Sequence, residues 1–454
     1  DRAALGSLLE AFDLQSAATR TGVDAKVIER IGKALAAAKA PVALPPGVAF
    51  TSRRAAATAS AILILNQVTG AIGSTVKIPP VSLGTAPRAS YREVLALIDA
   101  MKSGKVQVLL IHDADPLYSL SPATGFAEAL AKVPFVVSFA SMPDETATRA
   151  QLILPDHSPA ESWGDTSPQP GIRGIVQPTF RPLYDTRALV DTLLDVGRAM
   201  GDAVVAKLPA GSFRQIVQQA YAGSDWRKVL ATGGVFEPMP LAPGLALAPG
   251  VAKLEVAEPL LEGDGEWALV AYPSPLLYDG RGANLPWLQE VPDPVTKIAW
   301  QSWVEVSQAT AAKLGAEVGD VVAVETPFGR FEAPILPRGA LRDDVVAVAI
   351  GQGHTVGSYA SKGGKTTPGE ARGVSVIAAL PAATDEAGGR AWLSTKAKLS
   401  RTGRSERIAF LQKFDNQRER QLGETVPLSA LAAAAAPPPT NEAPAGEAPA
   451  AGAA

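Results

Sequence analysis

The sequence contains no cysteine among its 454 residues. Disulfides, thiolate-ligated zinc, cysteine-ligated iron–sulfur clusters and a cysteine nucleophile are therefore excluded from this chain. Histidine occurs only three times, and aromatic residues make up 6% of the chain. No apolar run approaches the roughly 20 residues that a transmembrane helix needs, so we expect no direct membrane span. The sequence opens at Asp1 without a signal peptide, which we interpret as a processed or cut N-terminus.

The chain also lacks a net positive charge, because its formal net charge is −3. We therefore expect no nucleic-acid partner. What is abundant is alanine, glycine and proline. The length allows two or three domains, each with its own core. We predict an α/β region over residues 1–265, a mostly β domain over 266–425 and a tail over 426–454. The tail is an Ala/Pro-rich segment that cannot bury a core and is expected to be disordered.

The most legible stretch covers residues 303–357. A short alternating strand leads to Ser307, which can cap a helix over 308–314 by accepting from the free amides of its first turn. Gly315 can end that helix in the left-handed conformation. Two β-branched strands joined by a hairpin turn at 327–329 follow, and a third strand runs into the glycine-rich loop 351–357. The pattern predicts a small closed β unit with one conspicuous loop.

Earlier in the chain, helical and apolar strand patterns alternate, which predicts a doubly wound, mostly parallel sheet. We expect helices over 25–39, 53–67 and 91–103, and strands over 106–112, 135–139 and 150–155. The strand over 106–112 is a continuous apolar run of the kind buried on both faces. Ligands of such sheets bind outside the carboxyl ends of the strands. The stretch over 162–182 is dense in glycine and proline and is interpreted as a loop.

Several residue patterns leave alternatives open. Asp156-His157-Ser158 invites a hydrolase interpretation, although no G-x-S-x-G elbow is present. His112, His157 and Glu161 form a metal site if the strand ends converge. The loop from Gly351 to Gly357 offers bare amides that can hold an anion, or simply makes tight turns at a barrel rim.

The loop that follows the strand near residue 270 is also polar and rich in glycine. Its Arg281, Asn284, Trp287 and Gln289 suit a polar ligand or an interface. The alternative is an ordered crossover loop with a buried tryptophan.

Several segments together resemble the molybdopterin oxidoreductase family. They are AILILNQVTGAIGS, VQVLLIHDADPLYSL, FVVSFASMPDETATRAQLILPDHSPAESWGD and the stretch from Trp303 to His354. The resemblance covers most of residues 15–425. It implies an α/β domain with a doubly wound, mostly parallel sheet, followed by a C-terminal double-psi β-barrel that binds a molybdopterin dinucleotide.

The resemblance also implies a set of cofactor-binding positions, vestigial or conditional on a bound cofactor. These are Asp115, Glu145, Thr146, Asp156, Arg281, Asn284, Gly351, Gln352, Gly353 and His354. No catalytic residue and no metal ligand is assigned in this chain.

The segments LPWLQEVPDPVTKIAWQSWVEVS, GQGH and TGRSERIAFLQKFDNQRERQ are most similar to one branch of the family, the iron–sulfur subunit of alternative complex III. That branch implies a scaffold for electron transfer in a membrane-associated quinol oxidoreductase, on the periplasmic side of the inner membrane. Its partners would be an iron–sulfur ferredoxin-like domain and haem-containing and integral membrane subunits. Iron–sulfur clusters would then lie only in those partners or in segments outside this sequence.

Three departures from the family pattern bear on the cofactor. An asparagine of the family is Asp115 here, a common aspartate is Gln151, and Ala140 stands where many members place an acid that can bind guanine. An acid near a pyrophosphate repels it, and an alanine accepts no hydrogen bond from guanine. We therefore expect a scaffold without molybdenum. The alternative is part of an active periplasmic oxidoreductase that binds molybdopterin guanine dinucleotide.

Overall fold

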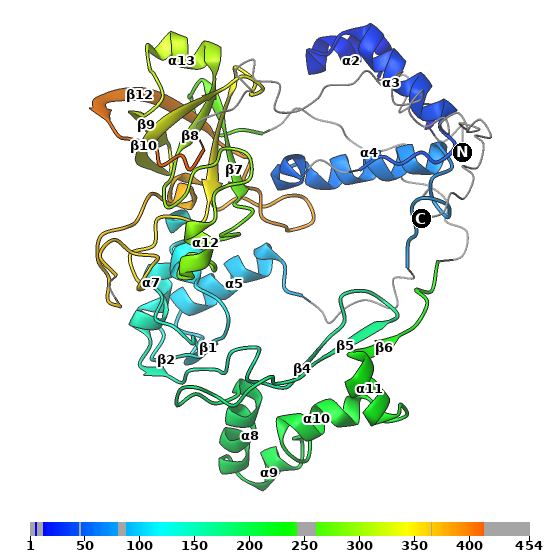
Figure 1. Ribbon diagram of the computed structural model, residues 1–454, viewed down its shortest axis with the longest axis vertical. Helices are drawn as coiled ribbons and strands as arrows, with labels where there is room; N and C mark the ends of the chain where they lie inside the picture. The colour runs from blue at the N-terminus through cyan, green and yellow to red at the C-terminus, as the bar shows by residue number, and fades with distance from the viewer. Residues whose placement is uncertain are drawn as a thin grey trace, which may run out of the picture.

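The computed structural model describes residues 5–6, 12–44, 47–79, 88–242, 260–364 and 366–412. Figure 1 shows the β-barrel at one end, the parallel sheet with α5 and α7 next to it, and the helices α8–α11 beyond a small antiparallel sheet. The helices α2–α4 lie to one side of the barrel.

The helices are α2 (Leu14–Thr21), α3 (Ala25–Ala37), α4 (Ala55–Val68), α5 (Tyr91–Lys102), α6 (Pro116–Ser119), α7 (Phe126–Leu130), α8 (Leu189–Ala199), α9 (Asp202–Val205), α10 (Phe213–Ala220), α11 (Trp226–Thr232), α12 (Pro286–Glu290) and α13 (Gln308–Leu314). The strands are β1 (Val108–Ile111), β2 (Phe135–Ser138), β3 (Leu152–Ile153), β4 (Gly164–Thr166), β5 (Ile172–Val176), β6 (Gly234–Phe236), β7 (Trp267–Pro273), β8 (Val304–Ser307), β9 (Asp320–Thr326), β10 (Gly329–Arg338), β11 (Val345–Ile350) and β12 (Lys396–Ser405).

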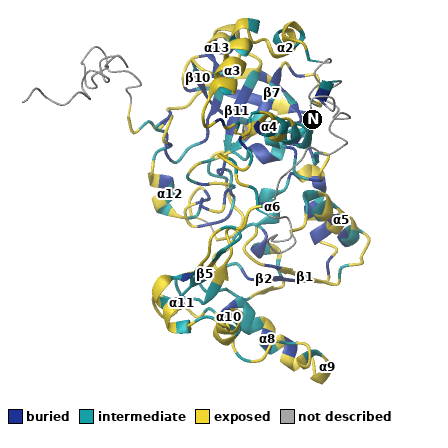
Figure 2. Cartoon of the chain, turned by 90° about the vertical axis from the view of Figure 1, so that its right-hand side faces the viewer, coloured by how far each residue is buried: buried dark blue, intermediate teal, exposed yellow. Residues whose placement is uncertain are grey.

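Six strands close into a barrel in the order β10-β8-β11-β7-β12-β9. The pairs β7–β11 and β8–β10 are parallel, whereas β9 pairs antiparallel with both β10 and β12. The interior is filled by apolar side chains such as Leu269, Val304, Ile335 and Val348, all of which are completely buried. Figure 2 shows this buried centre around β7 and β11. The closed barrel is confirmed, while its double-psi topology stays a prediction.

The local signals in the barrel act as the sequence predicts. Ser307 caps α13 by accepting a hydrogen bond from the Thr310 amide. Gly315 ends the helix with φ of 59°, a conformation that glycine adopts without strain. The hydroxyl of Thr326 accepts from the amides of Phe328 and Gly329, which fixes the hairpin between β9 and β10. These short-range contacts set the strand register around the barrel.

The parallel sheet has the order β1-β2-β3, and α5 and α7 pack on one of its faces through Ile98, Met101 and Val136. The prediction that the first strand is buried on both faces is wrong for the described residues. Val108 and Leu110 are 55% and 52% exposed, because the described helices cover only the face that carries Ile111. The doubly wound arrangement therefore stays a prediction.

The loop interpretation for residues 162–182 is wrong as well. This stretch contains β4 and β5, which form an antiparallel sheet with the distant β6. The glycines that suggested a loop are needed for close strand packing. A Cβ on Gly171 would lie 2.6 Å from the carbonyl oxygen of Glu237, which directly follows β6. The strand β6, which pairs with β5, lies about 60 residues further along the chain, so the local composition of 162–182 could not reveal the sheet.

Among the described residues, no helix combines the length and the apolar character needed to cross a bilayer. The predicted tail over residues 426–454 lies outside the described residues. The barrel strands fall between Trp267 and Ser405.

We expect Ile335→Ala to lower the free energy of unfolding by about 2–5 kcal/mol, because it leaves a cavity among buried barrel side chains. Val318→Ala is the matched control, since Val318 is 55% exposed and its truncation should cost no more than about 0.5 kcal/mol. Denaturant titration followed by circular dichroism measures both. Equal losses for the two variants would contradict the assigned barrel core.

Candidate functional site

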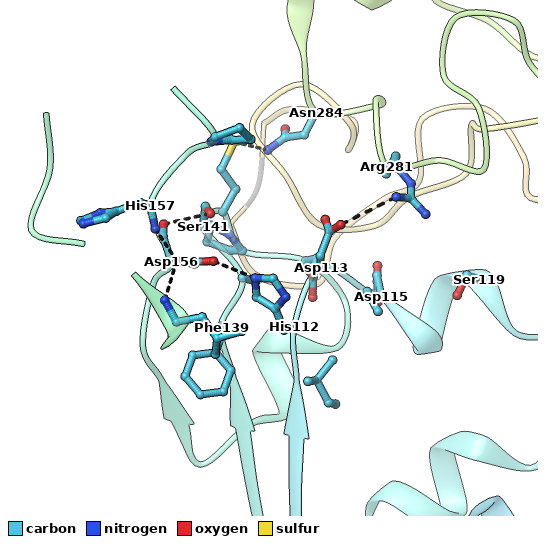
Figure 3. A pocket seen from close by; sticks show the side chains of 18 of the residues that line it. His112, Asp113, Asp115, Ser119, Phe139, Ser141, Asp156, His157, Arg281 and Asn284 are labelled. Atoms are coloured by element: carbon cyan, nitrogen blue, oxygen red, sulfur yellow. Dashed lines mark hydrogen bonds and ion pairs between the residues drawn. The ribbon is translucent and has the colours of Figure 1, made fainter. Parts of the chain in front are cut away.

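A cavity of about 560 Å³ lies at the carboxyl ends of the parallel strands and faces two loops of the barrel domain (Figure 3). The segments that follow β1, β2 and β3 all contribute to its wall, together with residues 279–284 and 354–360. The ends of the three strands therefore converge on one cavity. The cavity is the natural candidate for a functional site, since ligands of such sheets bind at these ends.

Asp156 organises one side of the cavity. Its Oδ2 lies 2.7 Å from Nε2 of His112, and its Oδ1 accepts from the amides of His157 and Leu189 (Figure 3). The imidazole of His157 instead contacts the hydroxyl of Thr186 at 2.7 Å. Asp156 therefore orients the start of α8 and the ring of His112. Asp156 does not bond to the imidazole of His157, so Asp156, His157 and Ser158 do not form a nucleophilic triad.

The alternative metal set of His112, His157 and Glu161 is not assembled either. Glu161 accepts from the backbone amides of Ser158 and Leu183, while each of the two histidines has its own separate partner.

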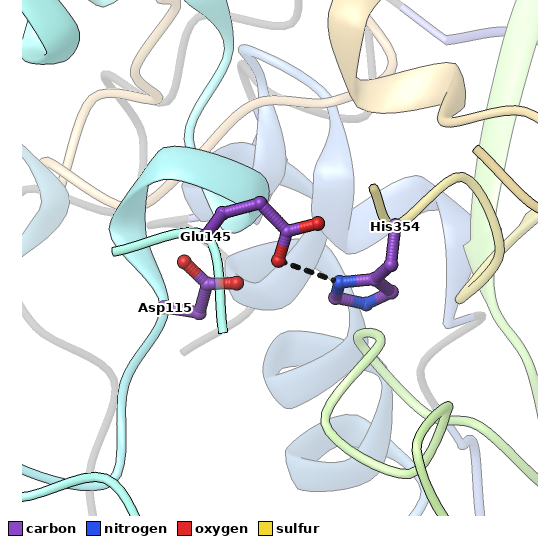
Figure 4. Close-up of side chains that lie close together, drawn as sticks. All are labelled: Asp115, Glu145 and His354. Atoms are coloured by element: carbon purple, nitrogen blue, oxygen red, sulfur yellow. Dashed lines mark hydrogen bonds and ion pairs between the residues drawn. The ribbon is translucent and has the colours of Figure 1, made fainter. Parts of the chain in front are cut away.

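Glu145 connects the α/β part of the chain to the glycine-rich barrel loop. It follows β2, and its Oε1 accepts hydrogen bonds from the amides of Thr355 at 2.6 Å and Val356 at 3.2 Å. Its Oε2 lies 3.0 Å from Nδ1 of His354 (Figure 4). Hydrogen bonds from backbone amides and an imidazole to one carboxylate are charge-assisted and strong. Glu145 thus acts as an internal anion held by the loop.

His354 is almost fully buried and is held from three sides. Its Nε2 lies 3.1 Å from the carbonyl oxygen of Gly280, which can only accept, so this nitrogen carries a proton. Its ring stacks on the Tyr118 ring, with centroids 3.6 Å apart and planes inclined by 12°. The Tyr118 hydroxyl donates to the carbonyl oxygen of Gln352. The other ring nitrogen, Nδ1, faces the Glu145 carboxylate.

Asp115 completes the cluster from the end of β1. Its Oδ1 accepts from the amide and the hydroxyl of Thr146, at 3.0 and 2.5 Å. The Thr146 hydroxyl in turn accepts from the Leu117 amide. No donor reaches the buried Oδ2 of Asp115. Thr146 is completely buried, so it orients Asp115 and does not face the cavity.

The two carboxyl groups respond to this environment in opposite directions. Burial, the hydrogen bond with Glu145 and the charges of Asp144 and Glu145 raise the pKa of Asp115 to about 8. Burial also acts to raise the pKa of Glu145, but hydrogen bonds from His354, Asp115 and the Thr355 amide outweigh it and hold this pKa at about 2. Near neutral pH Asp115 is therefore a neutral acid that donates to the Glu145 carboxylate.

Asp115, Glu145 and His354 also form a group whose ligand atoms are of the kind that binds metal ions. Ligand atoms of Asp115, Glu145 and His354 all lie within 4.8 Å of one another. Carboxylate oxygen and imidazole nitrogen are ligands that zinc accepts. However, Glu145 and His354 already bond to each other, and the loop amides hold the second Glu145 oxygen. The cluster is complete as a hydrogen-bonded junction.

The remaining predicted residues tie the loops around the cavity to one another. Arg281 forms a bidentate ion pair with Asp279, at 2.9 and 2.8 Å, and lies 3.8 Å from Asp113. Asn284 accepts from the amides of Tyr359 and Ala360 through its Oδ1. Gln352 is buried and donates to Gln289 at 2.7 Å.

The loop glycines are required by close packing. Gly351 and Gly353 both have positive φ, and a Cβ on Gly353 would lie 2.2 Å from the Ser375 nitrogen.

Sequence reasoning missed Tyr118 and Gly280, the residues that hold His354. A Cβ on Gly280 would lie 2.3 Å from the Tyr118 ring and 2.8 Å from His354 Nε2. No local pattern marks such residues, because their role depends on contacts between segments more than 70 residues apart. Gly280 alone carried a hint in the sequence, because a glycine in a polar loop often permits close approach of other groups to the backbone.

The comparisons with known proteins agree with this architecture. The family described as "Molydopterin dinucleotide binding domain" matches residues 289–385. The menaquinone reductase molybdopterin-binding-like subunit of Nitratidesulfovibrio vulgaris is 29% identical over 387 residues, which cover 79% of this chain and 54% of that protein. These likenesses support a subunit of the molybdopterin oxidoreductase family.

A second relative of this chain is more distant. NADPH-Fe(3+) oxidoreductase subunit alpha of Geobacter sulfurreducens is 26% identical over 260 residues, covering 56% of this chain and 28% of that protein. The chain thus spans about half or less of the curated relatives it matches. The structure of acetylene hydratase from Pelobacter acetylenicus has a TM-score of 0.59 at 16% identity, covering 76% of this chain and 58% of that one. This likeness shows a shared fold.

The residues that line the cavity do not fit the pyrophosphate of a dinucleotide cofactor. Five aspartates line it, namely Asp113, Asp115, Asp144, Asp156 and Asp279. Among the described lining residues the one arginine or lysine is Arg281, and its guanidinium is taken by Asp279. A pyrophosphate needs unpaired cations or free amides. The amides of Thr355 and Val356 are already bound to Glu145.

Asp115→Asn should raise the free energy of unfolding at pH 8 by roughly 2 kcal/mol, with little change near pH 4. The folded protein keeps the Asp115 proton up to about pH 8, whereas the unfolded chain loses it near pH 3.9. Between these values the folded state holds the extra proton, so wild-type stability falls as the pH rises. An asparagine donates to Glu145 at every pH and removes this loss. Denaturant unfolding between pH 4 and 8 measures the slopes.

Asp344→Asn is the matched control for that experiment. The hydrogen bond with Arg342 lowers the pKa of Asp344, so this variant should lose stability above pH 4 instead of gaining it. Parallel pH profiles for wild type and Asp115→Asn would contradict the shared proton.

Gly280→Ala should lower the free energy of unfolding by about 1–3 kcal/mol more than Gly403→Ala. Both glycines have positive φ, so the cost of backbone strain is shared. At Gly403 no atom lies within 4 Å of an added Cβ, whereas at Gly280 the methyl group meets Tyr118 and His354. Thermal unfolding measures the difference, and near-ultraviolet circular dichroism reports the tyrosine environment. Equal effects of the two substitutions would refute the packing of His354 against Tyr118 and Gly280.

Proposed function

We propose that this chain is a molybdopterin-oxidoreductase-like subunit of a respiratory oxidoreductase complex, where it serves as a scaffold for electron transfer. In this proposal it holds no molybdenum of its own and is not catalytic alone. The quinol-oxidising complex would be of the alternative complex III type. The relatives' names, menaquinone reductase subunit and NADPH-Fe(3+) oxidoreductase subunit alpha, support a place in such redox complexes.

The observation that carries the proposal is the position of the Glu145 carboxylate. It occupies the amides of Thr355 and Val356 in the glycine-rich loop, where an anionic ligand would otherwise bind. Displacing it would leave a buried carboxylate without its donors, which is costly. The four other aspartates of the cavity wall, Asp113, Asp144, Asp156 and Asp279, add repulsion toward a pyrophosphate. The interactions at this end of the sheet therefore favour a fixed junction between domains over an exchangeable ligand.

The partners follow from the resemblance and stay proposals. A chain without cysteine cannot hold cysteine-ligated clusters, so electrons would pass through a ferredoxin-like domain or subunit that carries iron–sulfur clusters. Haem-containing and integral membrane subunits would complete the complex on the periplasmic side of the inner membrane. The scaffold role requires only that the fold position these partners.

A second function has one observation in its favour. The cavity of about 560 Å³ opens at the strand ends, where ligands of such folds bind. Part of an active periplasmic oxidoreductase that binds molybdopterin guanine dinucleotide would use this space. That function requires Glu145 to leave the loop amides and Arg281 to leave Asp279.

Metal analysis and pterin fluorescence of the natural protein, purified from its own cells, test the proposal. We expect molybdenum and pterin far below one per chain, because the loop amides are already occupied. A molybdoenzyme purified in parallel controls for loss during preparation. Co-purification with haem-containing and membrane proteins should accompany the result. Stoichiometric molybdenum or pterin would overturn the scaffold assignment and support the enzyme.

A further inference from the structure

Arg390 is a partly buried arginine that forms no ion pair with a carboxylate among the described residues. Its Nη1 donates to the carbonyl oxygen of Ser119 at 2.6 Å. Its Cζ lies over the rings of Tyr91 and Trp392, 5.4 and 4.9 Å from their centroids. Such cation–π contacts attract the positive charge, but the ring faces offer no lone pair to the in-plane N–H groups. One edge of the guanidinium therefore needs another partner.

That edge consists of Nε and Nη2, both of which are buried without a hydrogen-bond partner. In a guanidinium these two N–H groups point the same way in one plane. They form the fork that binds both oxygens of a carboxylate or two oxygens of a phosphate. The opposite side of the group is held by Ser119 and the flanking rings. The orientation of the free edge is therefore fixed by the protein.

More unpartnered donors belong to the neighbouring residues. The Tyr91 hydroxyl, the Trp392 Nε1 and the Nε atoms of Arg53 and Arg54 are also buried without a partner. The segment that carries Arg390 runs beside the residues that precede α4 and beside the start of α5. The Leu393 amide donates to the carbonyl oxygen of Thr51, and the Arg92 amide donates to the carbonyl oxygen of Gly388. Apart from Asp115 Oδ2, every buried partnerless side-chain atom of the described chain belongs to this group. Buried donors are nearly always hydrogen-bonded in proteins, so this group of donors indicates an acceptor that is bound from outside the described chain.

The charges of the group have the same sign. Arg53 pairs with Glu262 and Arg54 with Glu386. Arg390 forms no such direct ion pair with a described residue, although the charge of Asp279 acts on it. Burial lowers the pKa of Arg390, although a guanidinium stays protonated in proteins. An uncompensated buried charge is strongly destabilising, so an anion at the free edge would stabilise the fold.

We propose that the Nε–Nη2 edge of Arg390 binds a small oxyanion, a carboxylate or a phosphate, with Tyr91 and Trp392 as additional donors. The bound group links the start of α5 to the segment that precedes β12. This site is separate from the cavity at the strand ends, since none of these three residues lines that cavity.

Binding to the full chain tests this site with inorganic phosphate and with acetate as probes, each compared with sodium chloride at equal ionic strength. We expect at least one probe to raise the unfolding temperature in proportion to ln(1 + [L]/Kd) and to give a calorimetric binding isotherm. Arg390→Lys keeps the charge but loses the fork, and should weaken binding at least tenfold. Arg342→Lys, at an exposed arginine that pairs with Asp344, should leave it unchanged.

The response of the two probes identifies the source of the oxyanion. Binding of phosphate alone assigns a phosphate group, and binding of acetate alone assigns a carboxylate. Tyr91→Phe and Trp392→Phe each remove one donor and should weaken binding several-fold, which keeps the test valid if Arg390→Lys does not fold. No binding of either probe, or equal binding by Arg390→Lys and wild type, would overturn the site.

Discussion

The junction between the α/β part and the barrel depends on one carboxylate. Glu145 gathers two loop amides and the His354 imidazole, and it does so in a place from which water is largely excluded. Charge-assisted hydrogen bonds gain strength in such surroundings. The Asp115 proton prevents two neighbouring acids from repelling each other. Without this carboxylate, the amides of Thr355 and Val356 would lose their acceptor, and the His354 ring that stacks on Tyr118 would lose its contact at Nδ1.

In the proposed scaffold, this arrangement would let the fold persist without cofactor chemistry. A glycine-rich loop with free amides is unstable unless an acceptor satisfies them. A bound anion can be that acceptor, and here a glutamate from the neighbouring domain takes the place. Under the proposed function, the fold would keep its geometry while the site changes from a ligand-binding loop to an internal contact. The same physical need for an acceptor recurs at Arg390, where no side chain of the described protein meets it.

Residues that act locally could be predicted from the sequence. Ser307, Gly315 and the hairpin near Gly329 work through neighbours within a few positions, so their patterns determined the barrel elements. Residues that act across the fold could not. The pairing of β5 with β6 and the stack of Tyr118 on His354 join segments that are distant in the chain. Site residues such as Glu145 came from the family resemblance, which supplied positions but not their protonation or partners.

The barrel order places the last strand, β12, between β7 and β9. The ring therefore cannot close until the chain has been synthesised through Ser405. Until then, β7 and β9 present open edges whose backbone groups can pair with other chains. Long-range pairing of this kind is slow to form. The nascent subunit thus has a vulnerable interval during synthesis, when chaperones or an assembly partner would protect it best.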